Sequence, residues 1–241
     1  MSLNILRLLH LADSAFPIGA TAHSFGLETL AVEGLLTPQQ LQPFLRDLLW
    51  ETGQVEALFG RLAYRCAAQE DHAGLEQWLQ LNIWLAALKP ARESREASAT
   101  LGRRFLQTVA HLAAAPVLHQ AQAAARQATI DIHYCTAFGL VGGALKLGEE
   151  ATILAYLQQS LMGLVSACLR LLPIGQGRTS ELLWSLQPLL TEVATASLAL
   201  APDEALEWEL TTLVARLPVF TPLLDLASMR HPTLSTRLFI S

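Results

Sequence analysis
Residues 16–28, FPIGATAHSFGLE, carry the residue types of an active-site loop between two leucine-rich segments. Asp13 would be the acid of a hydrolytic triad and His23 its base, with Ser14 or Ser24 as the nucleophile. A triad needs a scaffold that fixes its geometry, and the chain has no Gly-x-Ser-x-Gly elbow. We therefore predict no hydrolase: Asp13 and Ser14 end one helix, and His23 or Ser24 caps the next.

A second glycine-containing stretch, residues 173–180 (PIGQGRTS), resembles the end of a phosphate-binding loop. Leu172 occupies the place of the first glycine and Arg178 that of the lysine, and the preceding segment is helical in pattern. The stretch is better interpreted as a turn between helices, in which Gly175 or Gly177 takes a positive φ.

Histidine and cysteine spacing predicts no metal site. The seven histidines include no His-x-x-x-His pair, and none lies beside a second ligand at zinc-site spacing. The three cysteines are scattered, so we expect buried free thiols in a reducing compartment. They are Cys66, Cys135 and Cys168.

Composition limits the elements that could position these residues. Hydrophobic residues make up 52% of the 241 and charged residues 15%, against about 25% in typical domains. Leu and Ala dominate, which favours helix, and the excess predicts apolar surface buried against partners. The net charge of −5 argues against nucleic-acid binding through phosphates. The apolar segment 153–172 contains Gln158, Gln159 and Arg170, so we expect a core helix of a cytoplasmic protein and no membrane span.

Periodicity predicts an all-α, single-domain bundle of roughly eight to ten helices. Thr37-Pro38-Gln39-Gln40 is a helix-start signal with a capping box, and the apolar spacing behind it continues to Phe59. Further helices are expected over about 72–88, 90–115, 136–147, 149–172, after Gly177 with a kink at Pro188, and after Pro202.

The chain ends differently from the rest. Residues 1–217 form the predicted helical domain, and residues 218–241 form a docking tail interrupted by prolines and ending in Leu238-Phe239-Ile240. An apolar tail needs a surface on which to dock. A basic segment, 89–104, is either a solvated helix face, with Arg92 and Glu96 paired one turn apart, or a strip for an acidic partner.

Three separated parts of the chain together resemble the urease accessory protein F family of nickel-insertion chaperones. The first is LADSAFPIGATAHSFGLE, residues 11–28, and the second is RESRE, residues 92–96. The third consists of C-terminal stretches, LPIGQ at 172–176, DLASMRH at 225–231 and STRLF at 235–239. Their order and spacing match across nearly the whole chain.

The resemblance implies an all-α protein with no catalysis and no cofactor of its own. Family members dimerise, bind a UreD/UreH-type accessory protein and recruit a UreG-type GTPase, which carries nickel to apo-urease. The resemblance also implies that the tail helps to build the docking surface. The partner-binding residues it implies are Pro17, Gly19, His23, Ser24, Gly26, Glu28, Arg170, Gly175, Gln176, Ser228, Met229, Arg230, His231, Arg237 and Phe239.

The tail departs from the family pattern at several positions. Pro232 stands where the family usually has Glu, and Ser235 where it has Tyr. Arg170 replaces a common lysine, and Cys135 a common proline. These departures affect the details of tail docking.

Two other functions are compatible with the chain. A GTPase-activating protein would insert an arginine finger, with Arg230, Arg178 or Arg170 as candidates. A binder of lipid or another hydrophobic ligand would need a large internal cavity.

Overall fold

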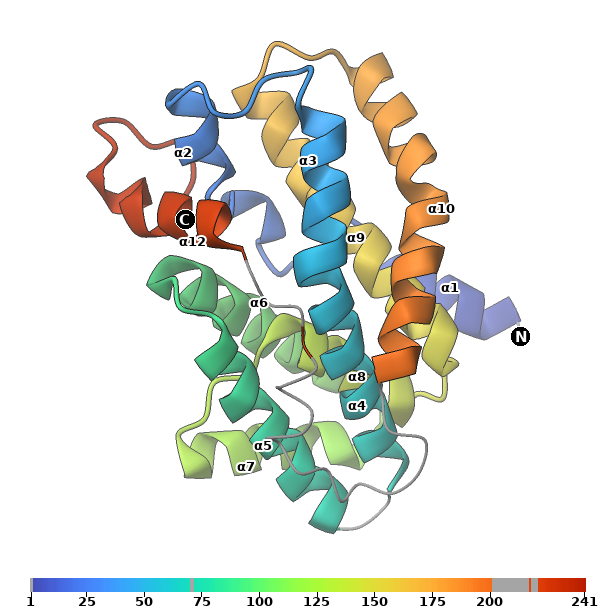
Figure 1. Cartoon of the computed structure of the whole chain (residues 1–241). Coiled ribbons are helices and arrows are strands. Elements are labelled where there is room, and N and C mark those ends of the chain that lie inside the picture. The colour runs from blue at the N-terminus through green and yellow to red at the C-terminus, as the bar shows by residue number, and fades with distance from the viewer. Residues whose placement is uncertain (1, 70–71, 201–216, 218–220) are drawn as a thin grey trace.

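The computed structural model describes residues 2–69, 72–200, 217 and 221–241 (Figure 1). Within these ranges every regular element is helical, so the predicted all-α, single helical domain is confirmed. The α-helices are α1 Ser2–Leu11, α2 Leu27–Val32, α3 Leu41–Leu48, α4 Gln54–Ala68, α5 His72–Leu88, α6 Arg92–Leu112, α7 Pro116–Ala128, α8 Tyr134–Ala144, α9 Glu149–Leu171, α10 Gln176–Leu200 and α12 Pro222–Arg230. Short 3-10 turns are η1 Ala20–Ala22 and η3 His231–Thr233, and η2 Leu49–Gly53 is a π turn.

Helix α8 lies at the centre of the bundle and is buried from Tyr134 to Gly143. It crosses α4 closely, because a Cβ on Gly139 would overlap the carbonyl oxygen of Gly60. Phe138 of α8 stacks on Phe105 of α6, with ring centroids 4.9 Å apart. The small and aromatic residues of this sequence therefore position α4, α6 and α8 as one core.

The contact between Gln40 and Thr37 predicted for the capping box forms, but Thr37 is not the N-cap, because the helix begins at Leu41 with Gln40 before it. The Gln40 side-chain oxygen accepts hydrogen bonds from the Thr37 backbone N–H at 3.1 Å and from its hydroxyl at 2.9 Å. The apolar run to Phe59 spans α3, the π turn and α4, which follow one another without a break (Figure 1).

The sequence prediction missed one helix, and the kink that it placed at Pro188 stays a prediction. Helix α7 was not expected, since its buried residues are Leu118, Ala121 and Ala125, and alanine gives a weak apolar signal. Helix α10 contains Pro188 within one continuous element from residue 176 to 200. The helix predicted after Pro202 lies outside the described residues.

Helix α9 is long and apolar enough, by length and composition, to cross a membrane, and half of its apolar window is buried in the bundle. At its start, the buried Arg61 of α4 contacts Glu149 at 3.0 Å and Glu150 at 2.5 Å. Arg61 also donates to the hydroxyl of Ser197 at 3.0 Å and to the carbonyl of Ala194 at 2.8 Å, both on α10. This buried guanidinium joins α4, α9 and α10.

All three cysteines are free and buried, as predicted. Burial raises the pKa of the Cys66 and Cys168 thiols to about 12.

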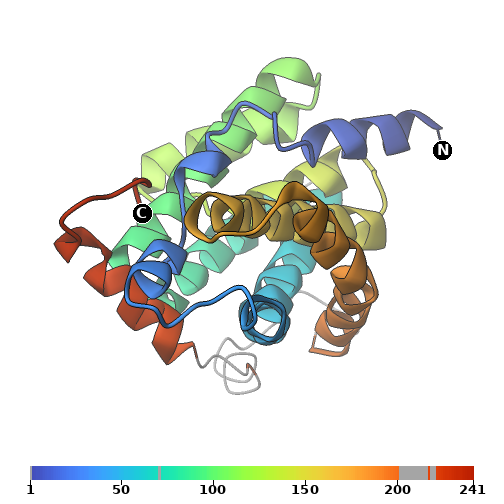
Figure 2. The ribbon, with the colours of Figure 1, turned by 90° about the horizontal axis from the view of Figure 1, so that it is seen from above.

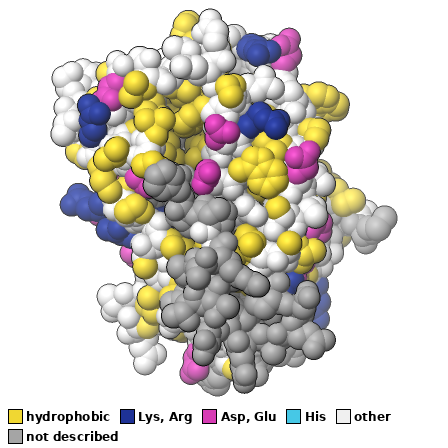
Figure 3. Space-filling view, in the orientation of Figure 1, with side chains coloured by type: hydrophobic (Ala, Val, Ile, Leu, Met, Phe, Trp, Pro, Cys, Tyr) yellow, Lys and Arg dark blue, Asp and Glu magenta, His cyan; other side chains and the backbone are white. Residues whose placement is uncertain are grey.

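The apolar excess of the sequence remains partly on the surface. Figure 3 shows hydrophobic side chains spread over the described part of one face. Trp184 of α10 is 75% exposed, and exposed leucines lie along α1. Seen from above, α1 and the C-terminal segment lie on opposite sides of the bundle (Figure 2).

Candidate partner-binding site
The C-terminal segment packs against α2 and α6 through a buried histidine. The His231 Nδ1 atom lies 2.7 Å from a carboxylate oxygen of Glu93, and its Nε2 atom lies 2.8 Å from one of Glu28. Each ring nitrogen of His231 therefore faces one carboxylate oxygen, and the imidazole bridges α2 and α6. We call Glu28, Glu93 and His231 the carboxylate–histidine cluster.

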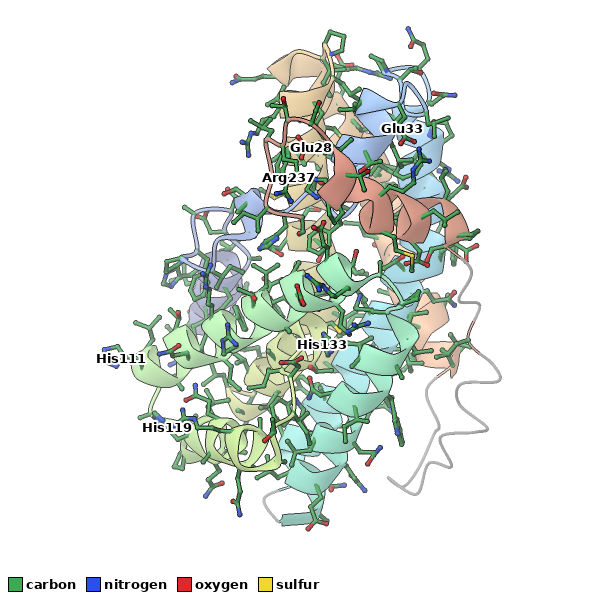
Figure 4. All side chains as sticks on the ribbon, turned by 90° about the vertical axis from the view of Figure 1, so that its left-hand side faces the viewer. Glu28, Glu33, His111, His119, His133 and Arg237 are labelled. Atoms are coloured by element: carbon green, nitrogen blue, oxygen red, sulfur yellow. The ribbon has the colours of Figure 1, made fainter. Side chains whose placement is uncertain are left out.

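Glu28 also binds the backbone of the tail. Its carboxylate accepts from the N–H of Leu238 at 2.5 Å and from the N–H of Phe239 at 3.1 Å. Burial opposes ionisation of Glu28, but the hydrogen bonds from Leu238, His231 and Phe239 outweigh it and lower its pKa. Figure 4 shows Glu28 and Arg237 close together where the tail meets α2. Arg237 lies 4.0 Å from Glu93, which places a guanidinium beside the carboxylates.

The last residues of the tail run along the loop from residue 16 to 28. The Ile240 N–H donates to the carbonyl of Ala22 at 2.9 Å, and His23 Nδ1 lies 2.7 Å from the Ser241 hydroxyl. Burial, and then the charge of Arg104, lower the pKa of His23. His23 therefore binds the tail and does not cap α2, which corrects that alternative. The Ser24 hydroxyl accepts a hydrogen bond from the Glu28 N–H at 3.4 Å, which is the kind of contact that a helix cap makes.

Arg170 of α9 fixes the other side of the tail. Its guanidinium lies 4.3 Å from the centre of the Phe239 ring, within the range of a cation–π contact. The same side chain donates to the carbonyl of Thr21 at 3.0 Å. Arg170 and Phe239 thus join α9, the 16–28 loop and the tail.

The glycines predicted to shape this corner behave in part as expected. Gly26 has φ 88°, and a Cβ there would lie 2.8 Å from Ser228 Oγ, so its predicted role in close packing is confirmed. Gly19 has φ 80° and lies against Arg104, which donates to the carbonyl of Ile18 at 3.2 Å. Pro17 is exposed beside this turn.

Gly175 and Gln176 lie at the corner between α9 and α10. The positive φ predicted for Gly175 or Gly177 is wrong, because the glycines with positive φ among the described residues are Gly19, Gly26, Gly34 and Gly148. The space around Gly175 is open. Because the glycines have no positive φ and no neighbouring groups enclose them, this corner is an exposed turn and does not form a phosphate-binding loop.

The outward side of the C-terminal segment is apolar with two cations. Ser228, His231 and Phe239 are buried, so they hold the segment in place and are not its exposed surface. Arg230 pairs with Glu33 of α2 at 2.7 Å but is 61% exposed. We define the tail surface by its exposed side chains, which are Leu223, Leu226, Met229, Arg230, Arg237, Leu238 and Ile240.

Sequence patterns did not single out several residues that build this site. Ser94 of α6 donates to Ser228 at 3.0 Å, and Glu93 binds His231. Both fall within the RESRE motif, which was only one part of a resemblance. The Arg92–Glu96 pair predicted from the same motif forms at 3.3 Å. The role of Glu93 could be assigned only from the structure, which places Glu93 opposite His231.

The triad types seen in the sequence do not assemble. A carboxylate oxygen of Asp13 accepts from the Ala15 N–H at 2.8 Å, and the partner of His23 is Ser241. Across the part of the chain that the structure describes, no group of three His, Cys, Asp or Glu side chains is arranged to hold a metal ion. The geometry is that of a C-terminal segment that is docked on the bundle and held there by buried polar contacts.

Comparison with known proteins shows the family. The UreF family model matches residues 35–187. The chain is 34% identical to the urease accessory protein UreF of Nostoc sp., over 99% of this chain and 96% of that protein. The chain belongs to the UreF family. It is also 33% identical to the UreF protein of Microcystis aeruginosa and 32% to that of Actinobacillus pleuropneumoniae, each over at least 97% of both chains. The resemblance stated from the motifs is therefore confirmed.

Within the UreF chain, the structure brings most of the predicted partner-binding residues to one place. Gly26, Glu28, Ser228 and His231 meet where α2 and α12 pack together, and His23 and Arg170 bind the last residues of the tail. Gly19 packs on Arg104 beside this site. Their role toward a partner stays a prediction, as does the domain boundary at residue 218.

Proposed function
We propose that this UreF-family chain is a non-enzymatic scaffold of urease maturation, which presents the tail surface to other accessory proteins. Family membership supports the role in urease maturation. The partners we propose are a UreD/UreH-type protein, a UreG-type GTPase and apo-urease. The scaffold holds the GTPase, which carries nickel, in register with the urease.

The observation that carries this proposal is the contact between Glu28 and His231. It fixes the C-terminal segment on the bundle and leaves Met229, Leu226 and Arg230 pointing to solvent. Apolar anchors beside an arginine are typical of binding hot spots. A docked segment with such a surface is suited to binding a protein and holds no catalytic constellation of its own.

The test is co-purification of the accessory proteins with variants of the tail surface. Arg230→Ala removes an exposed cation and should weaken assembly at least tenfold, with helicity by circular dichroism unchanged. Arg126→Ala, an exposed arginine on α7, is the matched control. Unaltered recovery of all partners with Arg230→Ala and with Met229→Asp would overturn the proposal.

The arginine-finger alternative is less well supported, because each candidate arginine already has a partner. Arg230 pairs with Glu33, Arg170 lies on Phe239, and Arg178 pairs with Glu181 at 3.2 Å. A finger raises GTP hydrolysis by about 10³–10⁵. The scaffold should leave the rate of the GTPase unchanged or lower it, which a single-turnover assay with and without this protein measures.

We further propose that the protein works as a cytoplasmic homodimer. The exposed apolar side chains of α1 and α10 support self-association. Sedimentation of the purified chain tests the dimer, and organic extraction followed by mass spectrometry tests the rival hydrophobic-ligand binder.

A further inference from the structure
A large groove lies apart from the tail surface. It has a volume of about 1690 Å³, and none of its lining residues belongs to the 16–33 or 221–241 segments. Small-molecule sites usually measure about 300–1,000 Å³. The groove is thus too large for a typical metabolite and has the size expected for a stretch of polypeptide. Its walls are α1, the adjoining ends of α4 and α5, the α6–α7 corner and α8.

The lining of the groove is mostly apolar. Leu75, Val109 and Leu140 are among its residues. Alanines line much of the rest, so the backbone of a bound segment could approach closely. They are Ala67, Ala113, Ala114, Ala115, Ala123, Ala124 and Ala144. Leu112 stands at the α6–α7 corner with 61% of its surface exposed. Figure 4 marks this corner by His111 on α6 and His119 on α7.

The charged side chains of the groove have one sign. Arg7 and Lys146 line it together with His10, and no Asp or Glu of the described residues does. The whole chain has 21 acidic and 16 basic residues, so charges of one sign among the described lining residues run against its composition. The Asn4 amide donates to the Lys146 carbonyl at 2.9 Å and so holds α1 against the α8–α9 corner. Arg7 of α1 and Lys146 of that corner therefore line the same groove.

We propose that this groove binds an amphipathic helix of a partner protein, with leucine-like side chains facing the alanine lining and acidic side chains facing Arg7 and Lys146. Helices bind such grooves through apolar residues at i, i+3, i+4 and i+7. A second copy of this chain is a poorer occupant, because a two-fold axis through the groove would bring the basic side chains of both copies together. The inference does not depend on which protein binds the tail surface.

The experiment uses the purified full chain and a fluorescein-labelled 14-residue helical peptide, with leucines on one face and glutamates on the other. A peptide with lysines in place of the glutamates is the comparison. We expect the acidic peptide to bind at least tenfold more tightly than the lysine peptide, with an affinity that falls as salt is raised. The double change Arg7→Glu, Lys146→Glu should reverse this preference.

Two further variants test the location. Ala124→Phe fills the groove and should abolish binding, whereas Arg103→Glu, an exposed change on α6 outside the groove, should leave it intact. Circular dichroism and thermal unfolding establish that each variant is folded. Equal binding of both peptides, or full binding to a folded Ala124→Phe variant, overturns the proposal. A change in sedimentation of the peptide-free Ala124→Phe variant would identify a second copy as the occupant, which also overturns it.

Discussion
Glu28 and His231 are 203 residues apart in sequence and 2.8 Å apart in the structure, both buried. Glu28 belongs to the first turn of α2, and His231 follows α12. Because the same carboxylate also accepts two backbone N–H groups of the tail, one side chain contacts both His231 and the end of the chain.

Replacing Glu28 should release the tail. In Glu28→Gln the amide puts a donor where only acceptors fit, so we expect the free energy of unfolding to fall by about 1.5–3 kcal/mol. Amide hydrogen exchange at Leu238 and Phe239 should become faster. Glu33→Gln is the control, since its partner Arg230 is exposed and such pairs contribute about 0–1 kcal/mol. Equal effects of the two changes would contradict the central role of Glu28.

The pKa of Glu28 predicts acid sensitivity of the tail. Its folded pKa is lowered, so the folded state binds fewer protons than the unfolded chain near the ordinary carboxyl pKa. The stabilisation by Glu28 is therefore complete above that pKa and is lost as pH falls through the lower, folded value. Exchange at Leu238 should accelerate in this range in the wild type. A Glu28→Gln variant should show no such acceleration beyond its already fast rate.

The lowered pKa of His133 predicts that stability also depends on pH in a higher range than the one set by Glu28. Burial first, and then the charges of Lys89 and Arg95, lower its pKa from 6.5 to about 3. Between these values the unfolded chain takes up a proton that the folded chain does not, so stability declines as pH falls. The slope should reach about 1.4 kcal/mol per pH unit. Urea unfolding between pH 7 and 5 measures it: His133→Asn should flatten the curve, and the exposed His119→Asn should not (Figure 4).

A comparison of Gly26 with Gly34 distinguishes the stability cost of backbone strain from that of steric crowding. Gly26 has φ 88° and packs on Ser228, whereas Gly34 has φ 71° and nothing within 4 Å of an added Cβ. Gly34→Ala should cost about 1 kcal/mol from the backbone alone. Gly26→Ala should cost clearly more and should also displace α12, raising exchange at Ser228. Thermal unfolding that ranks the two variants equally would show that crowding at Gly26 is unimportant.

Arg61 is the strongest candidate for a single side chain that holds the bundle together. Truncation to Ala would remove its hydrogen bonds to Glu149, to the Ser197 hydroxyl and to the Ala194 carbonyl. Glu149 keeps Arg65 at 3.0 Å, so we expect the free energy of unfolding to fall by about 1.5–3 kcal/mol, as for a lost hydrogen bond to a charged group. Chemical denaturation of Arg61→Ala measures this loss. Arg178→Ala breaks an exposed pair with Glu181 and should change the unfolding free energy by less than about 1 kcal/mol.

Sequence alone was sufficient for the elements whose signals are local. Helical periodicity, the Thr37–Gln40 contact and the Arg92–Glu96 pair depend on residues a few positions apart, and each formed. The motifs around residues 16–28 and 225–239 were also sufficient for the family. Helix α7 was not predicted because alanine contributes little to an apolar periodicity.

Tertiary structure alone decided what these residues do. Residue types in the 16–28 loop suggested chemistry, but His23 and Glu28 turned out to bind the tail because the fold brings the chain end across that loop. Similarly, Glu93 gained its role from the packing of α12 on α6. Hydrogen bonds and ion pairs act over about 3–4 Å, whereas the distance between residues far apart in sequence is set only when the intervening helices pack. Local pattern therefore determined the helices, and packing determined the site.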